Sequence, residues 1–270
     1  MAVLAKERSS SSHWYTLAGE PAHKQPKAKG GGLRPTTLAD ARRINLIPSV
    51  TTITSIMAKP SLERWKLTQV GLTAYESKPS TDETAEYYAK RIVSQSMEST
   101  DEAANFGTEV HDAIEKWFTV KEQPPEELEV YVRPVISWFA EKGLEFVEAE
   151  RRVVNLKQGY AGMTDLVARG KNGQAAIIDW KTRKTYPGKK VKPYDWQPEQ
   201  IAAYAAAYWG EAAIEEGVVY GANVYISSTE PGRLEVNSYT PEEIKASYEV
   251  FKDVCRLWRW MKKYDPRNAG

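Results

Sequence analysis

The stretch GMTDLVARGKNGQAAIIDWK, residues 162–181, decides the fold prediction. Two mostly apolar runs flank Asn172-Gly173, a dipeptide typical of a tight hairpin turn, and each run has the length of a buried strand. If the runs pair around this turn, Asp165 lies opposite residue 178, 179 or 180. The pairing therefore predicts that Asp165 and Asp179 come close together.

Alternation along a strand places Asp179 and Lys181 on one face and turns Trp180 toward the packed side. Two carboxylates and an ammonium make a poor core, because burying unpaired charge costs several kcal/mol per ion. A divalent cation such as Mg²⁺ would account for the arrangement, since it prefers hard oxygen ligands. A surface hairpin with a structural Asp–Lys pair is the alternative.

Elements on both sides of the hairpin predict a mixed α/β (α+β) domain, in which helices flank a mixed central sheet. A helix capped by Thr108 is followed by a second from Glu126 to Lys142, and a third begins at Pro198. Thr240-Pro-Glu-Glu243 is a capping box that opens a final helix to about residue 264. The expected strands span residues 146–154, 159–168, 175–180, 218–227 and 233–239.

Two helical pairs at a spacing of four residues add polar groups. His111 and Glu115 share one helical face, and an imidazole is a further metal-compatible ligand. Gln200 and Tyr204 share another face and offer neutral hydrogen bonds suited to phosphates or bases. Viewed alone, a helical histidine is more often structural, and the second pair fits an ordinary amphipathic helix.

Net charge excludes little, since it is only +1 over 270 residues. Residues 181–192 nevertheless carry six cations, including Arg183 and Lys184, and we expect them to contact DNA. The alternative is a solvated surface run. The one cysteine rules out a four-cysteine iron–sulfur cluster and is typical of a reducing cytosol. With no long apolar run, we expect no membrane partner and a cytoplasmic protein.

Residues 1–45 are polar and basic, with Gly30-Gly31-Gly32 at their centre, and predict a flexible N-terminal arm containing a short strand at residues 13–17. Residues 46–270 are then expected to form a single domain with a helical N-terminal part.

Taken in order, Gly107…His111…Glu115, Gly162…Asp165, Asp179-Trp180-Lys181 and Gln200…Tyr204 resemble the RecB-like branch of the PD-(D/E)XK nuclease superfamily. The resemblance covers roughly residues 105–205. Lacking a cysteine cluster, the chain is most similar to the stand-alone exonucleases of this branch, of the phage or mitochondrial-maintenance type. The implied fold is a restriction-endonuclease-like core.

The resemblance also implies residue roles. His111, Asp165, Asp179 and the main-chain carbonyl of Trp180 would bind Mg²⁺ or Mn²⁺, and Lys181 would be catalytic. Gln200 and Tyr204 would help to hold DNA, while Glu115 fits the pattern without a defined role.

The expected activity is metal-dependent exonuclease action on DNA ends, single strands among them, in recombination, repair or phage replication. An annealing or single-strand-binding protein is a candidate partner. Two alternatives stay open, namely an endonuclease of the same superfamily and a DNA-binding module that has lost catalysis.

Overall fold

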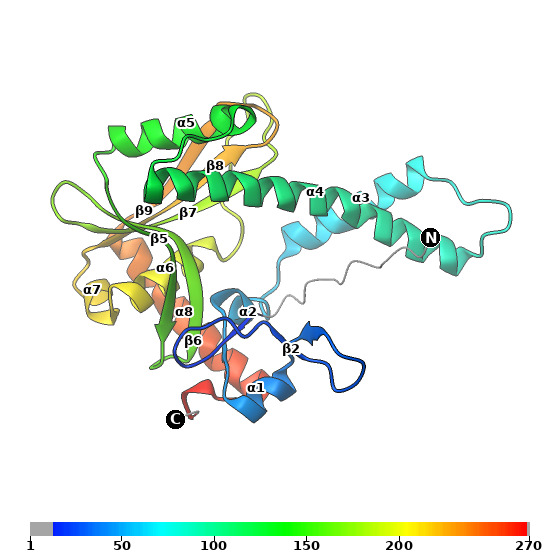
Figure 1. The fold of residues 1–270 in the computed structure, drawn as a ribbon, viewed down its shortest axis with the longest axis horizontal. Coiled ribbons are helices and arrows are strands. Elements are labelled where there is room, and N and C mark those ends of the chain that lie inside the picture. The colour runs from blue at the N-terminus through cyan, green and yellow to red at the C-terminus, as the bar shows by residue number, and fades with distance from the viewer. Residues whose placement is uncertain (1–12, 269–270) are drawn as a thin grey trace.

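A five-stranded sheet forms the centre of the protein, as seen in a computed structural model (Figure 1). The structure describes residues 13–268, and of residues 98–103 it describes the backbone alone. The strand order is β5-β6-β7-β8-β9; β7 and β8 run parallel, and the other neighbours are antiparallel. The strands are β5 (Glu145–Asn155), β6 (Tyr160–Arg169), β7 (Ala175–Arg183), β8 (Val219–Ser227) and β9 (Leu234–Tyr239). The expected mixed sheet is therefore confirmed.

Helices cover both faces of this sheet (Figure 1). The second half of α4, together with α5, packs on the face that carries Trp180. The face that carries Ile177 is covered by α6 and α8. The alanine-rich α6 lies close to β8 because Gly221 has no Cβ, which would come within 2.5 Å of Ile201 Cγ2. The larger helices are α3 (Pro60–Glu76), α4 (Ala85–Val120), α5 (Glu126–Glu141), α6 (Gln197–Tyr208) and α8 (Pro241–Lys262), with α7 (Glu211–Glu215) and the 3₁₀ turn η1 (Pro266–Asn268) shorter.

Residues 13–45 do not form a flexible arm but fold onto the domain. Trp14 is buried, and its ring centroid lies 6.2 Å from that of Trp258 in α8. Thr37 and Asp40 form a capping box, and Arg34 pairs with Asp40. The expectation missed this because the anchoring contacts come from distant residues. The elements here and just beyond are β1 (Trp14–Tyr15), β2 (Lys24–Pro26), β3 (Leu33–Pro35), α1 (Leu38–Ile44), β4 (Ile47–Pro48) and α2 (Val50–Thr54). The first twelve residues of the expected arm lie outside the described residues.

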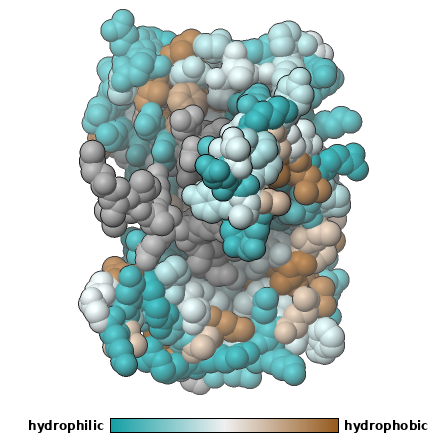
Figure 2. Space-filling view, turned by 90° about the vertical axis from the view of Figure 1, so that its right-hand side faces the viewer, coloured by the Kyte–Doolittle hydropathy of each residue, from teal (hydrophilic) through white to brown (hydrophobic). Residues whose placement is uncertain are grey.

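The helix that carries His111 begins far earlier than expected. Thr84, not Thr108, caps α4, and the Thr108 hydroxyl donates to the Ala104 carbonyl within the helix. The first half of α4 pairs with α3 as a helical arm that projects beyond the sheet (Figure 1). The tip of this arm faces the viewer in Figure 2 and is mostly hydrophilic. None of the described helices is long and apolar enough to cross a bilayer.

Candidate active site

The β6–β7 hairpin brings two carboxyl groups together near the middle of the sheet. Leu166 pairs with Ile178, so Asp165 and Asp179 occupy the next positions on the two strands. Asp179 is 2% exposed, and the Lys181 ammonium lies 2.8 Å from its Oδ1 and 2.7 Å from its Oδ2. The opposite direction of Trp180 is as expected, since its ring packs among the aromatic side chains beneath α4 and α5.

His111 reaches the same place from α4. Its Nδ1 lies 3.8 Å from Asp165 Oδ2. The helix can approach the sheet this closely because Gly107 lacks a Cβ, which would lie 2.7 Å from Thr182 Oγ1. The main chain of Trp180 connects the two groups, since its N–H donates to Asp165 Oδ2 at 2.8 Å and its backbone is hydrogen-bonded to His111. The structure thus brings together the imidazole, both carboxyl groups and the Trp180 backbone.

The electrostatics of this cluster follow from burial and from its charges. Burial and the neighbouring Asp179 raise the pKa of Asp165 to about 8. Burial alone would lower the pKa of Lys181, but Asp179 and Asp165 outweigh it and raise that pKa, so the amine stays protonated. Burial, with Lys181 nearby, lowers the pKa of His111, which favours the neutral imidazole that a metal requires.

Asn223 on β8 was missed by the sequence reasoning. It lies beside Asp179 in the parallel β7–β8 register, and its Nδ2 donates to Asp179 Oδ2 at 2.8 Å. Its Oδ1 accepts a 2.8 Å hydrogen bond from the Tyr239 hydroxyl on β9. Asn223 is fully buried and therefore fixes the orientation of the carboxylate. The available signal was an asparagine within an otherwise apolar strand.

Glu150 is a second residue that the sequence did not reveal. It lies on β5 with a left-handed φ of 47°, which is unusual for a residue other than glycine. Burial raises its pKa to about 7, with Glu115 and Asp112 of α4 adding to the effect. Glu115 therefore lies at the edge of the cluster, facing Glu150. The alternation of polar and apolar residues along β5 did not distinguish Glu150 from a glutamate that is exposed to solvent.

Gln200 and Tyr204 lie behind β6. Gln200 Nε2 donates to the Tyr204 hydroxyl at 3.1 Å, as expected for a pair on one helical face. A Cβ at Gly162 would lie 2.6 Å from Tyr204 Cε1, so this glycine makes room for the ring. The ring is almost fully buried, and burial raises the pKa of its hydroxyl.

The two basic candidates differ in their surroundings. Lys184 is exposed, whereas Arg183 is partly buried and donates to the Lys192 carbonyl at 2.9 Å. The Arg183 guanidinium also lies 4.1 Å from the centroid of the Tyr194 ring. Arg183 thus stabilises the segment that contains Lys192 and Tyr194, whereas the charge of Lys184 is exposed to solvent.

Donor chemistry fits a hard divalent cation, because carboxylate, carbonyl and imidazole groups converge from three elements. Over the part of the chain that the structure describes, no three His, Cys, Asp or Glu side chains are grouped tightly enough to form a metal site by themselves.

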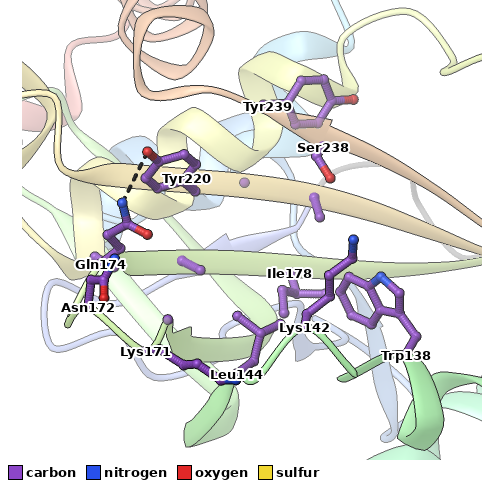
Figure 3. A pocket seen from close by; sticks show the side chains of 15 residues that line it. Trp138, Lys142, Leu144, Lys171, Asn172, Gln174, Ile178, Tyr220, Ser238 and Tyr239 are labelled. Atoms are coloured by element: carbon purple, nitrogen blue, oxygen red, sulfur yellow. Dashed lines mark hydrogen bonds between the residues drawn. The ribbon is translucent and has the colours of Figure 1, made fainter. Parts of the chain in front are cut away.

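A cavity of about 350 Å³ lies toward the other end of β7, and its lining includes none of Asp165, Asp179, Lys181 and His111. Figure 3 shows Trp138 and Lys142 on one side of it and Ser238 and Tyr239 on the other. Gln174 donates a hydrogen bond to the Tyr220 hydroxyl at one end of the cavity. The carboxylates and the amine of the candidate active site thus lie outside this cavity, and Tyr239, which bonds to Asn223, stands between the two.

Comparison with known proteins identifies the family. A profile described as "PD-(D/E)XK nuclease superfamily" matches residues 128–268, more than half of the chain. The chain belongs to the PD-(D/E)XK nuclease superfamily. Asp165, Asp179, Lys181 and the Gln200–Tyr204 pair lie inside the matched residues, and His111 lies before them. Nucleases of this superfamily generally use divalent metal ions such as Mg²⁺.

Solved structures offer more distant likenesses to this nuclease. One is titled "Crystal structure of SSO0001", with 14% identity over 73% of this chain and 86% of that chain and a TM-score of 0.29. Another is an alkaline exonuclease (LHK-Exo) from Laribacter hongkongensis, with 12% identity over 83% of this chain and 94% of that chain and a TM-score of 0.39. Among curated proteins, none matches the chain.

Proposed function

We propose that the protein is a Mg²⁺- or Mn²⁺-dependent DNA exonuclease of the RecB-like branch. The observation that supports this most directly is the 3.8 Å approach of His111 to Asp165, next to the Asp179–Lys181 pair. Helix and hairpin come from distant parts of the chain, and the acid, amine and imidazole that they supply match the chemistry of phosphodiester hydrolysis.

In this proposal His111, Asp165, Asp179 and the Trp180 carbonyl hold the metal. A bound divalent ion polarises a phosphate and lowers the pKa of its water. Asn223 orients Asp179 through its 2.8 Å hydrogen bond. Lys181 is held by Asp179 and would place its positive charge beside the oxygens of the reacting phosphate.

Strand binding is assigned to Gln200, Tyr204 and Lys184, with Arg183 acting through the loop that it supports. Glu115 and Glu150 would add negative charge at the edge of the cluster, which favours cations there.

We further propose that residues 46–270 form one nuclease domain onto which residues 13–45 fold. The proposed setting is a reducing cytosol, bacterial or phage-infected, in recombination, repair or phage replication. Cys255 is consistent with that setting, since it is a buried free thiol. An annealing or single-strand-binding protein is the proposed partner.

The decisive test is digestion of end-labelled linear DNA and of covalently closed circular DNA with Mg²⁺, Mn²⁺ or EDTA. We expect linear DNA to be shortened from its ends with either metal, and the circle to survive. Asp179→Asn and Lys181→Gln should each lower the rate by about a hundred-fold or more, because each removes a charge at the reacting centre. Asp253→Asn is the matched control, since Asp253 pairs with Arg256 on the exposed side of α8.

Each contrary result has a clear meaning. Cleavage of the circle would replace the exonuclease with an endonuclease. Binding of DNA without any metal-dependent product would indicate a module that has lost catalysis. Full activity of either charge variant would refute the assigned centre.

A further inference from the structure

The loop between β7 and α6 is strongly basic and open to solvent. We call residues 184–194 the basic loop. It contains no acidic residue, and its four lysines are all exposed: Lys184, Lys189, Lys190 and Lys192. Two tyrosines lie among and beside them, Tyr186 at 62% exposure and Tyr194 at 52%. Exposed aromatic rings among cations are the composition of a surface that binds unpaired nucleotides.

Side chains of the β8–β9 turn hold the backbone of the basic loop. Thr185 is buried and hydrogen-bonded to Ser227 at 2.6 Å, and its carbonyl accepts from Thr229 at 2.8 Å. Arg233 donates to the Tyr186 carbonyl at 2.9 Å and also to that of Lys189. These hydrogen bonds thus use backbone carbonyls of the loop and the buried Thr185 hydroxyl, not its exposed side chains.

The second half of the loop is anchored in the same way. Glu235 accepts a 2.7 Å hydrogen bond from the Val191 N–H, and Gln197 accepts one of 2.8 Å from the Tyr194 N–H. Because these hydrogen bonds engage the backbone of the basic loop, they fix the path of the chain and leave the lysine ammoniums and the tyrosine rings exposed to a ligand. A preorganised surface loses less conformational entropy when it binds a ligand.

Both tyrosine rings already interact with a cation. The Lys189 ammonium lies 5.6 Å from the centroid of Tyr186, and the Arg183 guanidinium lies 4.1 Å from that of Tyr194. These contacts restrict each ring while leaving more than half of its surface exposed. A base stacked on such a ring would place its phosphates within reach of the neighbouring lysines.

The loop is also continuous with the candidate active site at both ends. It begins three residues after Lys181 and ends three residues before Gln197, which opens the helix of Gln200 and Tyr204. Both elements that carry site residues are thus joined directly to the loop, and a strand bound along it could continue toward the proposed centre.

We propose that the basic loop binds single-stranded DNA, with Tyr186 and Tyr194 stacking on unpaired bases and the lysines contacting phosphates. This inference rests on the proposed nuclease function, whose substrate form it specifies. The rings decide for a single strand over a duplex, because paired bases keep their faces stacked on one another. Lysines alone would attract both forms through their phosphates.

The test measures binding in EDTA, so that it does not depend on cleavage. The probe is a labelled strand of about 20 nucleotides of mixed sequence, single-stranded or annealed to its complement, and fluorescence anisotropy gives the Kd. Three variants of the full chain are compared with the parent protein. A ring variant carries Tyr186→Ala and Tyr194→Ala, and a charge variant carries Lys184→Gln, Lys189→Gln and Lys192→Gln.

The third variant is a matched control, Tyr75→Ala with Lys78→Gln. Tyr75, at the end of α3, is 76% exposed, and the Lys78 ammonium lies 4.9 Å from its ring centroid. This pair repeats the geometry of Tyr186 and Lys189 away from the proposed centre. We expect its Kd for either probe to equal that of the parent protein.

The two loop variants should give different signatures. The ring variant loses two stacked bases, so it should bind the single strand more weakly, by about 30-fold or more, with an unchanged salt slope and a duplex Kd within about twofold. The charge variant should lose about 2 units from the slope of log Kd against log salt for the single strand, since three phosphate contacts contribute about 0.7 each. A merely structural role of the rings would not separate the two probes.

An unchanged single-strand Kd in the ring variant, or equal losses on both probes, would overturn the proposal. If loss of the Arg183 contact unfolds the ring variant, Tyr186→Ala alone decides by the same criteria. Failure of the nuclease proposal would appear separately, as full cleavage by Asp179→Asn with single-strand binding still dependent on the rings.

Discussion

Asn223 provides the sharpest test of how the protein holds Asp179. Replacing Asn223 with alanine removes the 2.8 Å hydrogen bond to a carboxylate that is 2% exposed, and it also leaves the Tyr239 hydroxyl without its acceptor. A hydrogen bond to a charged group contributes about 1.5–3 kcal/mol, and a neutral one about 1 kcal/mol. We therefore expect Asn223→Ala to lower the free energy of unfolding by about 3 kcal/mol, or Tm by roughly 6–12 °C.

The assay is thermal and urea unfolding in EDTA, so that metal affinity does not enter. Tyr239→Phe is the control that removes the hydroxyl alone, and it should cost about 1 kcal/mol. In an Asp179→Ala background the cost of Asn223→Ala should fall to that same value, which gives a coupling of about 2 kcal/mol between Asn223 and Asp179. Additive costs, or a Tyr239→Phe variant as unstable as Asn223→Ala, would refute the reasoning.

Three further predictions concern other parts of the structure. Gly162→Ala should destabilise the protein by about 1–3 kcal/mol, because the new Cβ meets Tyr204 at 2.6 Å, and Tyr204→Leu should relieve most of that cost in urea unfolding. Glu211 is partly buried, which would raise its pKa, but Lys157 and the Tyr248 hydroxyl lower it to about 2. Its ionised form therefore stabilises the fold above about pH 4.5, so Glu211→Gln should be less stable than the parent protein near pH 7. The difference in free energy of unfolding should shrink as the pH falls toward 2, and a difference independent of pH would contradict this. With the pKa of Asp165 raised to about 8, the folded state keeps a proton that the unfolded chain releases near pH 4, so stability in EDTA should fall as the pH rises between these values. Asp165→Asn should show no such fall, and added Mg²⁺ should raise Tm only in the parent protein.

Local patterns in the sequence predicted the hairpin and its register well. Asn172-Gly173 closes a turn in which Gly173 has a φ of 73°, and the pairing of Leu166 with Ile178 sets Asp165 next to Asp179. The capping box at Thr240 is also confirmed. These features depend on neighbouring residues or on strict alternation, so their signals are contained in short segments.

Features that depend on distant partners were not predictable in this way. The first half of α4 packs on α3, a partner that the local pattern does not reveal, so the start at Ala85 was missed. The burial of Trp14 depends on Trp258, more than two hundred residues away. Asn223 acquires its role only through the parallel β7–β8 register, which no local pattern reveals.

Helix α4 is uninterrupted and about 54 Å long, and only its second half, which carries His111, is packed on the sheet. The buried side chains of Val110 and Ile114 fix the rotation of α4 against the sheet, so an insertion in its first half does not turn His111. One extra residue there would instead swing the outer tip by about 100° and advance it by about 1.5 Å, separating it from α3. An insertion of seven residues, close to two helical turns, would therefore lengthen the arm and keep its face toward α3 while the imidazole stays where it is.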